Sequence, residues 1–263
     1  MSGFYGTEQQ RALQRRTQMM RDRIADAHGI YDAGRFMGID EPEKVPPSEV
    51  ERMLARDGLV AFRMISPAQA ASVFPPLEAR GYRIDTWDIF VGGLDDAGAR
   101  AQAIACRPLP DGLAVGPLHD DPEGAETLAL QRFLAASGLA PFPGGRLLAL
   151  PPRAKTIVVR EGDQIAATGH AYFPHNAHSR FRDHAWVGLI AVDERWRGKG
   201  LGRLINALLV RAAFEELGAA RVYEMVAPSN ASSRRMVEAC GLALDPALRC
   251  GVAMPGSAAR FTR

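Results

Sequence analysis

Residues 187–202 read Val-Gly-Leu-Ile-Ala-Val-Asp-Glu-Arg-Trp-Arg-Gly-Lys-Gly-Leu-Gly, and this stretch decides the fold of the chain. It begins as an apolar run typical of a buried strand and passes through a short charged turn into a glycine-rich loop. A helix follows at once, with Leu204, Ile205, Leu208 and Leu209 on one face. Glycines let a backbone approach an anion, and the first turn of a helix offers unpaired N–H groups. The stretch therefore predicts a phosphate-binding site.

Two common phosphate-binding designs do not fit the spacing. A dinucleotide-binding fold needs a third glycine where this chain has Arg203, and here the charged residues 193–197 separate the strand from the glycines. A P-loop needs Gly-Lys followed by Ser or Thr, whereas Gly198-Lys199 is followed by Gly200. An incidental glycine-rich turn before a surface helix remains the structural alternative.

The pattern that remains, Arg197-x-x-Gly200-x-Gly202, resembles the pyrophosphate-binding signature of the GNAT superfamily of acetyl-CoA-dependent N-acetyltransferases. A second motif of that family follows downstream: an Asn, a small residue three positions later, an aromatic residue and then Gly-Phe. The corresponding residues here are Asn230, Ser233, Val237 and Gly241-Leu242, with the same order and spacing. The resemblance extends over residues 102–263 and is strongest between residues 187 and 242.

The resemblance implies an α/β fold of the GNAT type, in which helices flank a mixed, mostly antiparallel central sheet. It also implies acetyl-CoA as cosubstrate and an amine acceptor as partner. We therefore expect an N-acetyltransferase that acetylates a primary amine, more readily that of a small molecule than of a protein. The counterparts of the family's cofactor-binding residues are Ile190, Ala191, Val192, Arg197, Gly198, Lys199, Gly200, Leu201, Gly202, Arg203, Asn230 and Ser233.

Two other functions remain open at this point. The chain could be a non-catalytic acyl-CoA-binding regulatory module, or it could be a protein N-acetyltransferase with a peptide groove. Release of free thiol from acetyl-CoA in the presence of amines separates an enzyme from a binding module.

Two residues are candidates for the general base, which must deprotonate the acceptor ammonium. His184 lies thirteen residues before Arg197, at the start of the same strand, where some members of the family carry an acidic base. Its imidazole titrates near neutral pH, although a partly satisfied surface histidine is the structural alternative. Glu224 lies on the facing strand and is the second candidate, acting through a water.

The general acid is where the sequence departs from the family pattern. The position that often carries a tyrosine, thought to protonate the departing thiolate, is Val237, and valine cannot donate a proton. A thiol with a pKa near 8.5 can leave without help, so this loss does not exclude activity. Tyr223, Ser233 and Cys240 are alternative donors.

Composition excludes several classes of protein. With 263 residues, 47% of them hydrophobic, the chain can bury a full core, and a net charge of +2 does not indicate a nucleic-acid partner. Three widely spaced cysteines predict neither a disulfide framework nor a zinc site, and His175-x-x-His178 has no further ligands nearby, so we expect no metal. The polar residues 7–23 and the lack of long apolar runs predict a cytoplasmic protein without a membrane partner. The oligomeric state is left open.

The pattern of elements predicts two regions, residues 1–100 and 102–263, separated by the glycine- and acid-rich residues 92–98. The first region is a smaller α/β unit with helical character at 7–35, a connector at 40–47, and a strand-helix-strand unit at 59–65, 67–80 and 82–91. As a hypothesis, this unit is a truncated GNAT-like half, although any such unit gives the same pattern.

The second region is the predicted GNAT domain. Its expected elements are a strand at 103–107, a helix at 123–137, a hairpin at 156–160 and 164–173, a strand at 185–192, the helix after the glycine loop, a strand at 221–226, a helix from Asn230 and a terminal pair of strands within 242–263.

Overall fold

A computed structural model of the protein describes residues 3–148 and 153–257, built around one 11-stranded sheet. The sheet order is β1-β2-β3-β11-β4-β9-β8-β7-β6-β5, and β10 pairs with β4 beside this path. The strands are β1 (Ile30–Asp32), β2 (Met37–Ile39), β3 (Val60–Ile65), β4 (Tyr82–Gly93), β5 (Leu113–Gly116), β6 (Ala154–Glu161), β7 (Gln164–Tyr172), β8 (His184–Val192), β9 (Arg221–Val226), β10 (Ala243–Leu244) and β11 (Arg249–Pro255). Neighbouring strands are antiparallel except for the pairs β2–β3 and β8–β9.

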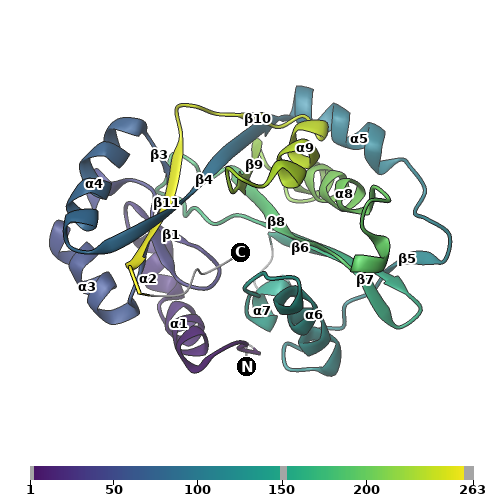
Figure 1. Ribbon diagram of the computed structural model, residues 1–263, viewed down its shortest axis with the longest axis horizontal. Coiled ribbons are helices and arrows are strands. Elements are labelled where there is room, and N and C mark those ends of the chain that lie inside the picture. The colour runs from purple at the N-terminus through teal and green to yellow at the C-terminus, as the bar shows by residue number, and fades with distance from the viewer. Residues whose placement is uncertain (1–2, 149–152, 258–263) are drawn as a thin grey trace.

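Helices cover both faces of this sheet (Figure 1). They are α1 (Glu8–Met19), α2 (Arg21–Asp26), α3 (Pro47–Asp57), α4 (Pro67–Ala79), α5 (Ala99–Ala105), α6 (Ala125–Ala136), α7 (Gly144–Leu147), α8 (Leu201–Glu215) and α9 (Ala231–Ala239), with shorter helical turns at η1 (Pro42–Lys44), η2 (Leu94–Gly98) and η3 (Glu194–Trp196). The expected GNAT-type fold, a mostly antiparallel mixed sheet between helices, is confirmed.

In the C-terminal half, the sheet is packed between two layers of helices. On one face, α5, α8 and α9 bury Ile205 and Leu209 against strand residues such as Val187 and Val222. On the other face, α6 and the segment around α7 close a second cluster that contains Phe142. Because successive strand residues point to opposite faces, β8 contributes to both clusters.

The N-terminal half has its own core, formed by α2, α3 and α4 against β2, β3 and β11. Ser66 begins α4 with a capping box: its side chain accepts from the backbone N–H of Gln69, and the Gln69 side chain accepts from the Ser66 N–H. This half therefore starts its helix with a serine cap and Pro67 rather than with a glycine-rich turn.

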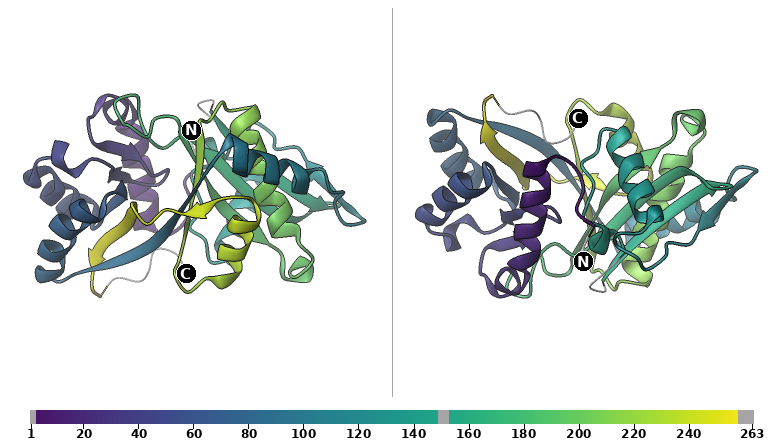
Figure 2. Two further views of the ribbon diagram at one scale, coloured as in Figure 1. Left: turned by 90° about the horizontal axis from the view of Figure 1, so that it is seen from above. Right: turned by 90° about the horizontal axis from the view of Figure 1, so that it is seen from below.

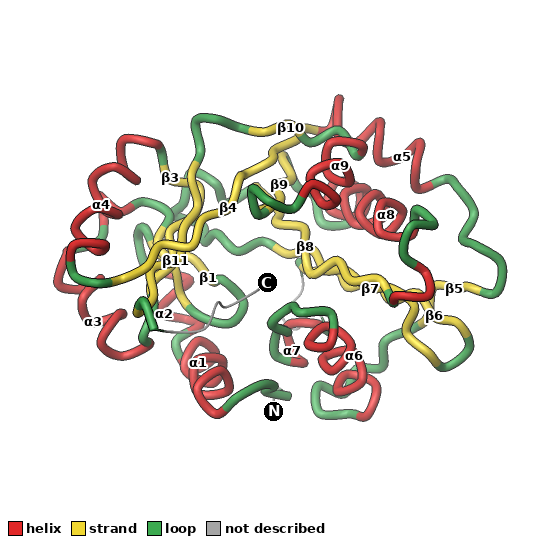
Figure 3. The backbone as a smooth tube through the Cα atoms, in the orientation of Figure 1, coloured by secondary structure: helices red, strands yellow, loops and turns green. Residues whose placement is uncertain are grey.

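Strand β4 joins the two halves, because its first part pairs with β11 and its second part pairs with β9. The C-terminal strand β11 lies between β3 and β4, so the yellow end of the chain lies among the blue N-terminal elements (Figures 1 and 2). The tube drawing shows the same strands as one band across the molecule (Figure 3). The sheet thus runs unbroken through the expected boundary, and the division into residues 1–100 and 102–263 remains a prediction.

Each half contains a strand-helix-strand unit with parallel strands. In the C-terminal half, this unit is β8-α8-β9, whose strands pair directly at their beginnings. In the N-terminal half, it is β3-α4-β4, where both strands are antiparallel to the intervening β11 and hence parallel to each other. The two units differ in what lies between their strands.

Two sequence expectations are wrong in detail. Residues 103–107 end a helix rather than form a strand, because Ala97, Ala101 and Ile104 recur at helical spacing and pack into the α8 cluster. The N-terminal helical region ends at Asp26 rather than at residue 35, and β1 begins at Ile30. The two strands expected within 242–263 are present as β10 and β11, and both pair with β4.

Candidate active site

The parallel strands β8 and β9 are hydrogen-bonded only at their beginnings and then separate. They pair from His184–Arg221 to Trp186–Tyr223, and no later pair joins them. The outer edge of β8 stays on β7 and the outer edge of β9 stays on β4, so the inner edges beyond Trp186 and Tyr223 face an opening. A cavity of about 770 Å³ fills this opening and is lined by residues 186–192 of β8 and 224–226 of β9.

A bulge in β8 lies within this lining. Thr168 pairs with Ala191 and His170 with Gly188, so that Leu189 and Ile190 stand opposite Gly169 alone. Leu189 has a φ of +53°, a conformation that costs free energy for a residue with a Cβ. A bulge bends its strand and re-aims its backbone groups, and this one does so where β8 has left β9.

One end of the cavity is the glycine-rich turn after β8. Gly198 and Gly200 have φ values of +77° and +82°, which glycine adopts without strain. Gly200 is the N-cap of α8 and supplies no side-chain hydrogen bond, so the first N–H groups of that helix remain available to an anion. Arg197 and Arg203 line the same end and add positive charge.

Nearly all residues predicted to bind the cofactor line this one cavity. They are Ile190, Ala191, Val192, Arg197, Gly198, Gly200, Leu201, Gly202, Arg203, Asn230 and Ser233. Asn230 also caps α9 by accepting from the Ser233 N–H at 3.0 Å. Lys199 is not among the lining residues, and its ammonium lies 4.3 Å from the centre of the Trp196 ring. Cofactor binding by these residues remains a prediction that the shared cavity supports.

His184 does not reach the cavity. It is the first residue of β8, where that strand still pairs with β9, and its ring packs edge-on against Phe181 at 5.3 Å between centroids. Burial, together with the nearby His175, lowers the pKa of His184 to about 4, so its imidazole is neutral at pH 7. The base role of His184 remains a sequence prediction that the geometry does not favour.

Glu224 does line the cavity, one residue after the last β8–β9 pair. Its side chain is 3% exposed, and one carboxyl oxygen accepts from the Asn206 Nδ2 of α8 at 2.8 Å. Burial raises the pKa of Glu224 to about 8, only partly offset by that hydrogen bond. At neutral pH its carboxyl group is therefore mostly protonated and can donate a proton.

The other proposed donors are less suited to proton transfer. Burial raises the pKa of the Cys240 thiol to about 12, and burial also raises the pKa of Tyr223 well above its usual value. Neither residue lines the cavity, whereas Ser233 does. Val237 of α9 is fully buried, so the side chain at the position of the family tyrosine packs in the hydrophobic core.

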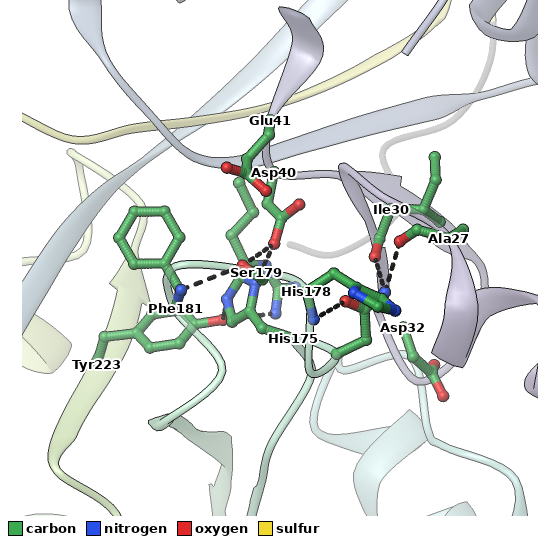
Figure 4. Close-up of polar contacts among 12 residues, drawn as sticks. Ala27, Ile30, Asp32, Asp40, Glu41, His175, His178, Ser179, Phe181 and Tyr223 are labelled. Carbon is green, nitrogen blue, oxygen red and sulfur yellow. Dashed lines mark hydrogen bonds and ion pairs between the residues drawn. The ribbon is translucent and has the colours of Figure 1, made fainter. Parts of the chain in front are cut away.

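A buried polar network connects the two halves beside the cavity (Figure 4). Asp40 accepts from the Ser179 hydroxyl at 2.6 Å and contacts His175 Nδ1 at 2.7 Å. His175 Nε2 lies 3.1 Å from the Tyr223 hydroxyl, which also accepts from Arg63 Nη1 at 3.2 Å. Burial lowers the pKa of His175, and its contact with Asp40 is then an Nδ1–H donated to the carboxylate. Tyr223 donates to the Nε2 of this neutral ring.

The sequence analysis missed this network, although one signal was present. Arg63 stands in the middle of the apolar strand Val60–Ile65, and a charge in such a run is rarely buried without a function or a partner. With Tyr31, Phe36 and Trp87 of the N-terminal half and Trp186 of β8, it lines the end of the cavity remote from the glycine-rich turn. The cavity thus has a phosphate-binding end and an aromatic end with a buried arginine.

Comparison with known proteins agrees with this architecture. Residues 125–242 match the Acetyltransferase (GNAT) family. A GCN5-related N-acetyltransferase from Kribbella flavida is 16% identical over 84% of this chain and 78% of its own, with a TM-score of 0.56. A tandem GNAT protein from the clavulanic acid biosynthesis pathway is 14% identical over 85% of this chain and 76% of its own, with a TM-score of 0.56.

The likeness of fold extends through both halves. A Drosophila protein is 12% identical over 95% of this chain and 89% of its own, with a TM-score of 0.57. The comparison with curated protein sequences gives no match. None of the helices within residues 3–148 and 153–257 is long and apolar enough to cross a membrane. The same residues contain no cluster of three or more His, Cys, Asp or Glu side chains suited to a metal ion.

The raised pKa of Glu224 predicts a specific dependence of stability on pH. The folded pKa of about 8 lies above the usual glutamate pKa of 4.5, so folding favours the protonated carboxyl, and this contribution is lost as the pH rises from about 4.5 toward 8. Relative to Glu224→Gln, which cannot ionise, the free energy of unfolding of the wild type should fall by up to about 1.4 kcal/mol per pH unit. Urea denaturation of both proteins between pH 5.5 and 7.5 measures this difference. A difference that stays constant over the range would contradict the burial of an ionisable Glu224.

Proposed function

Because residues 125–242 belong to the GNAT family of acetyltransferases, we propose that this protein transfers the acetyl group of acetyl-CoA to a primary amine of a small molecule. The observation that carries the proposal is the opening between β8 and β9, which leads from the glycine-rich turn to an aromatic chamber. The cavity offers an anion-binding end, two free strand edges and a closed acceptor end, in the order that the reaction needs.

The residues of the turn and the strand edges fit acetyl-CoA. The pyrophosphate would bind the N–H groups at the start of α8, with Arg197 and Arg203 supplying charge. The inner edge of β8 beyond the bulge would hydrogen-bond the extended arm of the cosubstrate, as one strand pairs with another. Backbone N–H groups near Ile190 and Ala191 would polarise the thioester carbonyl. Asn230 and Ser233 at the start of α9 close the same end.

We propose Glu224 as the group that protonates the leaving thiolate. The neutral amine nitrogen attacks the thioester carbon, and the carbon–sulfur bond breaks as the carbonyl re-forms. Glu224 gives its proton to the sulfur, and the proton lost from the acceptor nitrogen returns to the Glu224 carboxylate through water in the cavity. A pKa of about 8 is close to that of a thiol, which suits this transfer. Glu224 would thus take the place of the tyrosine that Val237 replaces.

The N-terminal half is proposed as a GNAT-like half without a cofactor site. Its β3-α4-β4 unit has the same strand directions as β8-α8-β9, but β11 fills the space between its strands. Ser66 and Pro67 stand where the glycine-rich turn would be. The role of residues 1–100 would then be to shape the acceptor end, to which Tyr31 and Arg63 contribute.

Enclosure of the acceptor end favours a small molecule over a peptide. Tyr31, Arg63 and Trp186 line it and are all buried, so the described residues form no open groove for an extended chain at this end. A binding module without chemistry would not need a protonated carboxyl in the cavity. Three free thiols also fit the cytoplasmic location that we propose, with no nucleic-acid or membrane partner.

The Gly200 turn gives the first test of this proposal. Gly200→Val should lower affinity for CoA by at least about tenfold, since a β-branched residue resists the φ of +82° and the turn must rearrange. Gly112→Val is the matched control, because Gly112 has a φ of +81°, equally open surroundings and a place outside the cavity. Calorimetric titration with CoA compares the two. Equal affinities would remove the turn from the binding site.

The second test concerns the proton that Glu224 donates. Glu224→Gln should lower kcat for acetyl transfer by about 10² to 10⁴ and abolish the decline in kcat above pH 8 that deprotonation of Glu224 causes in the wild type. Affinity for CoA should stay unchanged. Glu215→Gln, at the far end of α8, should behave as wild type. Release of free thiol across a panel of primary amines is the assay. An unchanged kcat in Glu224→Gln would show that Glu224 is not the acid that protonates the leaving thiolate.

A further inference from the structure

The end of the cavity remote from the glycine-rich turn holds three buried polar atoms without a partner. They are the Tyr31 hydroxyl, Arg63 Nε and Trp186 Nε1, none of which hydrogen-bonds to any described residue. All three side chains line the cavity. The Arg63 guanidinium carbon lies 4.7 Å from the Tyr31 ring centre and 5.8 Å from that of Trp186. The three groups therefore form one cluster around Arg63.

Arg63 is a buried charge without a neighbouring acid. Arg63 is 6% exposed. Within residues 3–148 and 153–257, no carboxylate lies within 4.0 Å of its guanidinium. Asp40 lies two hydrogen-bonded side chains away, beyond Tyr223 and His175, and accepts no hydrogen bond from Arg63. A guanidinium cannot shed its proton at neutral pH, and a buried unpaired charge is costly, so the pocket is suited to an anion.

The fold fixes the direction of this guanidinium. A bulge sets Arg63 and Met64 opposite Cys250 of β11, and Met64 has a φ of +59°. Tyr223 then accepts from Arg63 Nη1. The Tyr223 hydroxyl is itself held by His175, which contacts Asp40 (Figure 4). Asp40, His175 and Tyr223 are therefore positioning residues. They fix Arg63 from one side and leave its other nitrogens to a ligand.

The chemistry of the cluster selects the ligand. Arg and Trp side chains only donate hydrogen bonds, and a Tyr hydroxyl can donate as well, so the partner must be rich in acceptors. A carboxylate matches the planar guanidinium. Arg35 also lines this cavity, but its guanidinium donates to the Ala140 carbonyl and lies 4.9 Å from the centre of the Phe142 ring, so Arg63 is the arginine that we assign to the ligand. The two oxygens of a carboxylate can accept together from the unpartnered Arg63 Nε and a neighbouring nitrogen of the same guanidinium.

We propose that the acceptor is an amine that also carries a carboxylate, and that Arg63, with Tyr31 and Trp186, binds this carboxylate. The proposal rests on the proposed acetyl transfer and names its substrate class. The cosubstrate phosphates belong at the other end of the opening. Along β7, the residues opposite Trp186 and Val192 are Tyr172 and Ala167, and these five residue steps of about 3.3 Å give a length of roughly 17 Å, which separates the two anion sites.

The experiment compares each common amino acid and the ω-amino acids β-alanine and γ-aminobutyrate with the corresponding amide as acceptors. In the wild type, kcat/KM for at least one carboxylate should exceed that of its amide by about 10² or more. Arg63→Gln should lower kcat/KM for that carboxylate by about 10² and leave its amide little changed. Tyr31→Phe, which keeps the ring and removes only the hydroxyl, should reduce the same preference. Tyr172→Phe is the matched control, since that buried tyrosine lies outside the cavity and bonds the Asp32 carbonyl.

The outcomes separate this proposal from the proposed function. Acetylation of amines without any preference for a carboxylate, or a preference that survives Arg63→Gln, would overturn the carboxylate site while leaving acetyl transfer intact. If no amine is acetylated, the proposed acetyl transfer is rejected. The carboxylate site is then tested separately, by calorimetric titration of CoA-saturated protein with the same amino acids. Binding that Arg63→Gln abolishes would support the site, and no binding would overturn it. Unchanged CoA affinity in each variant verifies that it is folded.

Discussion

The structure depends on a single interruption of hydrogen bonding, the end of the β8–β9 ladder after Trp186 and Tyr223. Backbone N–H and C=O groups must be paired when they are buried, so two strands of one sheet separate only where something else satisfies their edges. Here the outer edges stay on β7 and β4, and the inner edges open into the cavity. The bulge at Leu189 and the glycines after the strand accompany this interruption and shape its two ends.

The two halves differ in what lies between the parallel strands of their strand-helix-strand units. Each contains a parallel strand-helix-strand unit, and in the N-terminal half the space between the strands is filled by β11, which pairs with both. The C-terminal half leaves the corresponding space open for a ligand. The bulge at Met64 in β3 matches the one at Leu189 in β8, but the N-terminal unit lacks glycines before its helix. It contributes Arg63 to the cavity rather than a phosphate-binding turn.

Much of the fold and of the glycine-rich end of the cavity could be predicted from local sequence, because the residues that determine them are contiguous. The glycines at 198 and 200 and the Asn230 cap each act within a few residues, and the structure has them as expected. The placement of His184 could not be predicted, since periodicity gives the face of a strand but not the point where two strands separate. The strand expected at 103–107 failed because a short run of alanines is compatible with either element until packing decides. The network of Asp40, His175 and Arg63 joins residues far apart in sequence.

We propose that acetyl-CoA binds in the opening between β8 and β9. Hydrogen–deuterium exchange with and without CoA tests it directly, since the free edges of β8 and the first N–H groups of α8 would gain partners. We expect CoA to slow exchange in residues 187–192 and 198–204, with little change in β3 and β11. Unchanged exchange there, or protection confined to the smaller cavity that Ile24 and Met53 line in the N-terminal half, would contradict it.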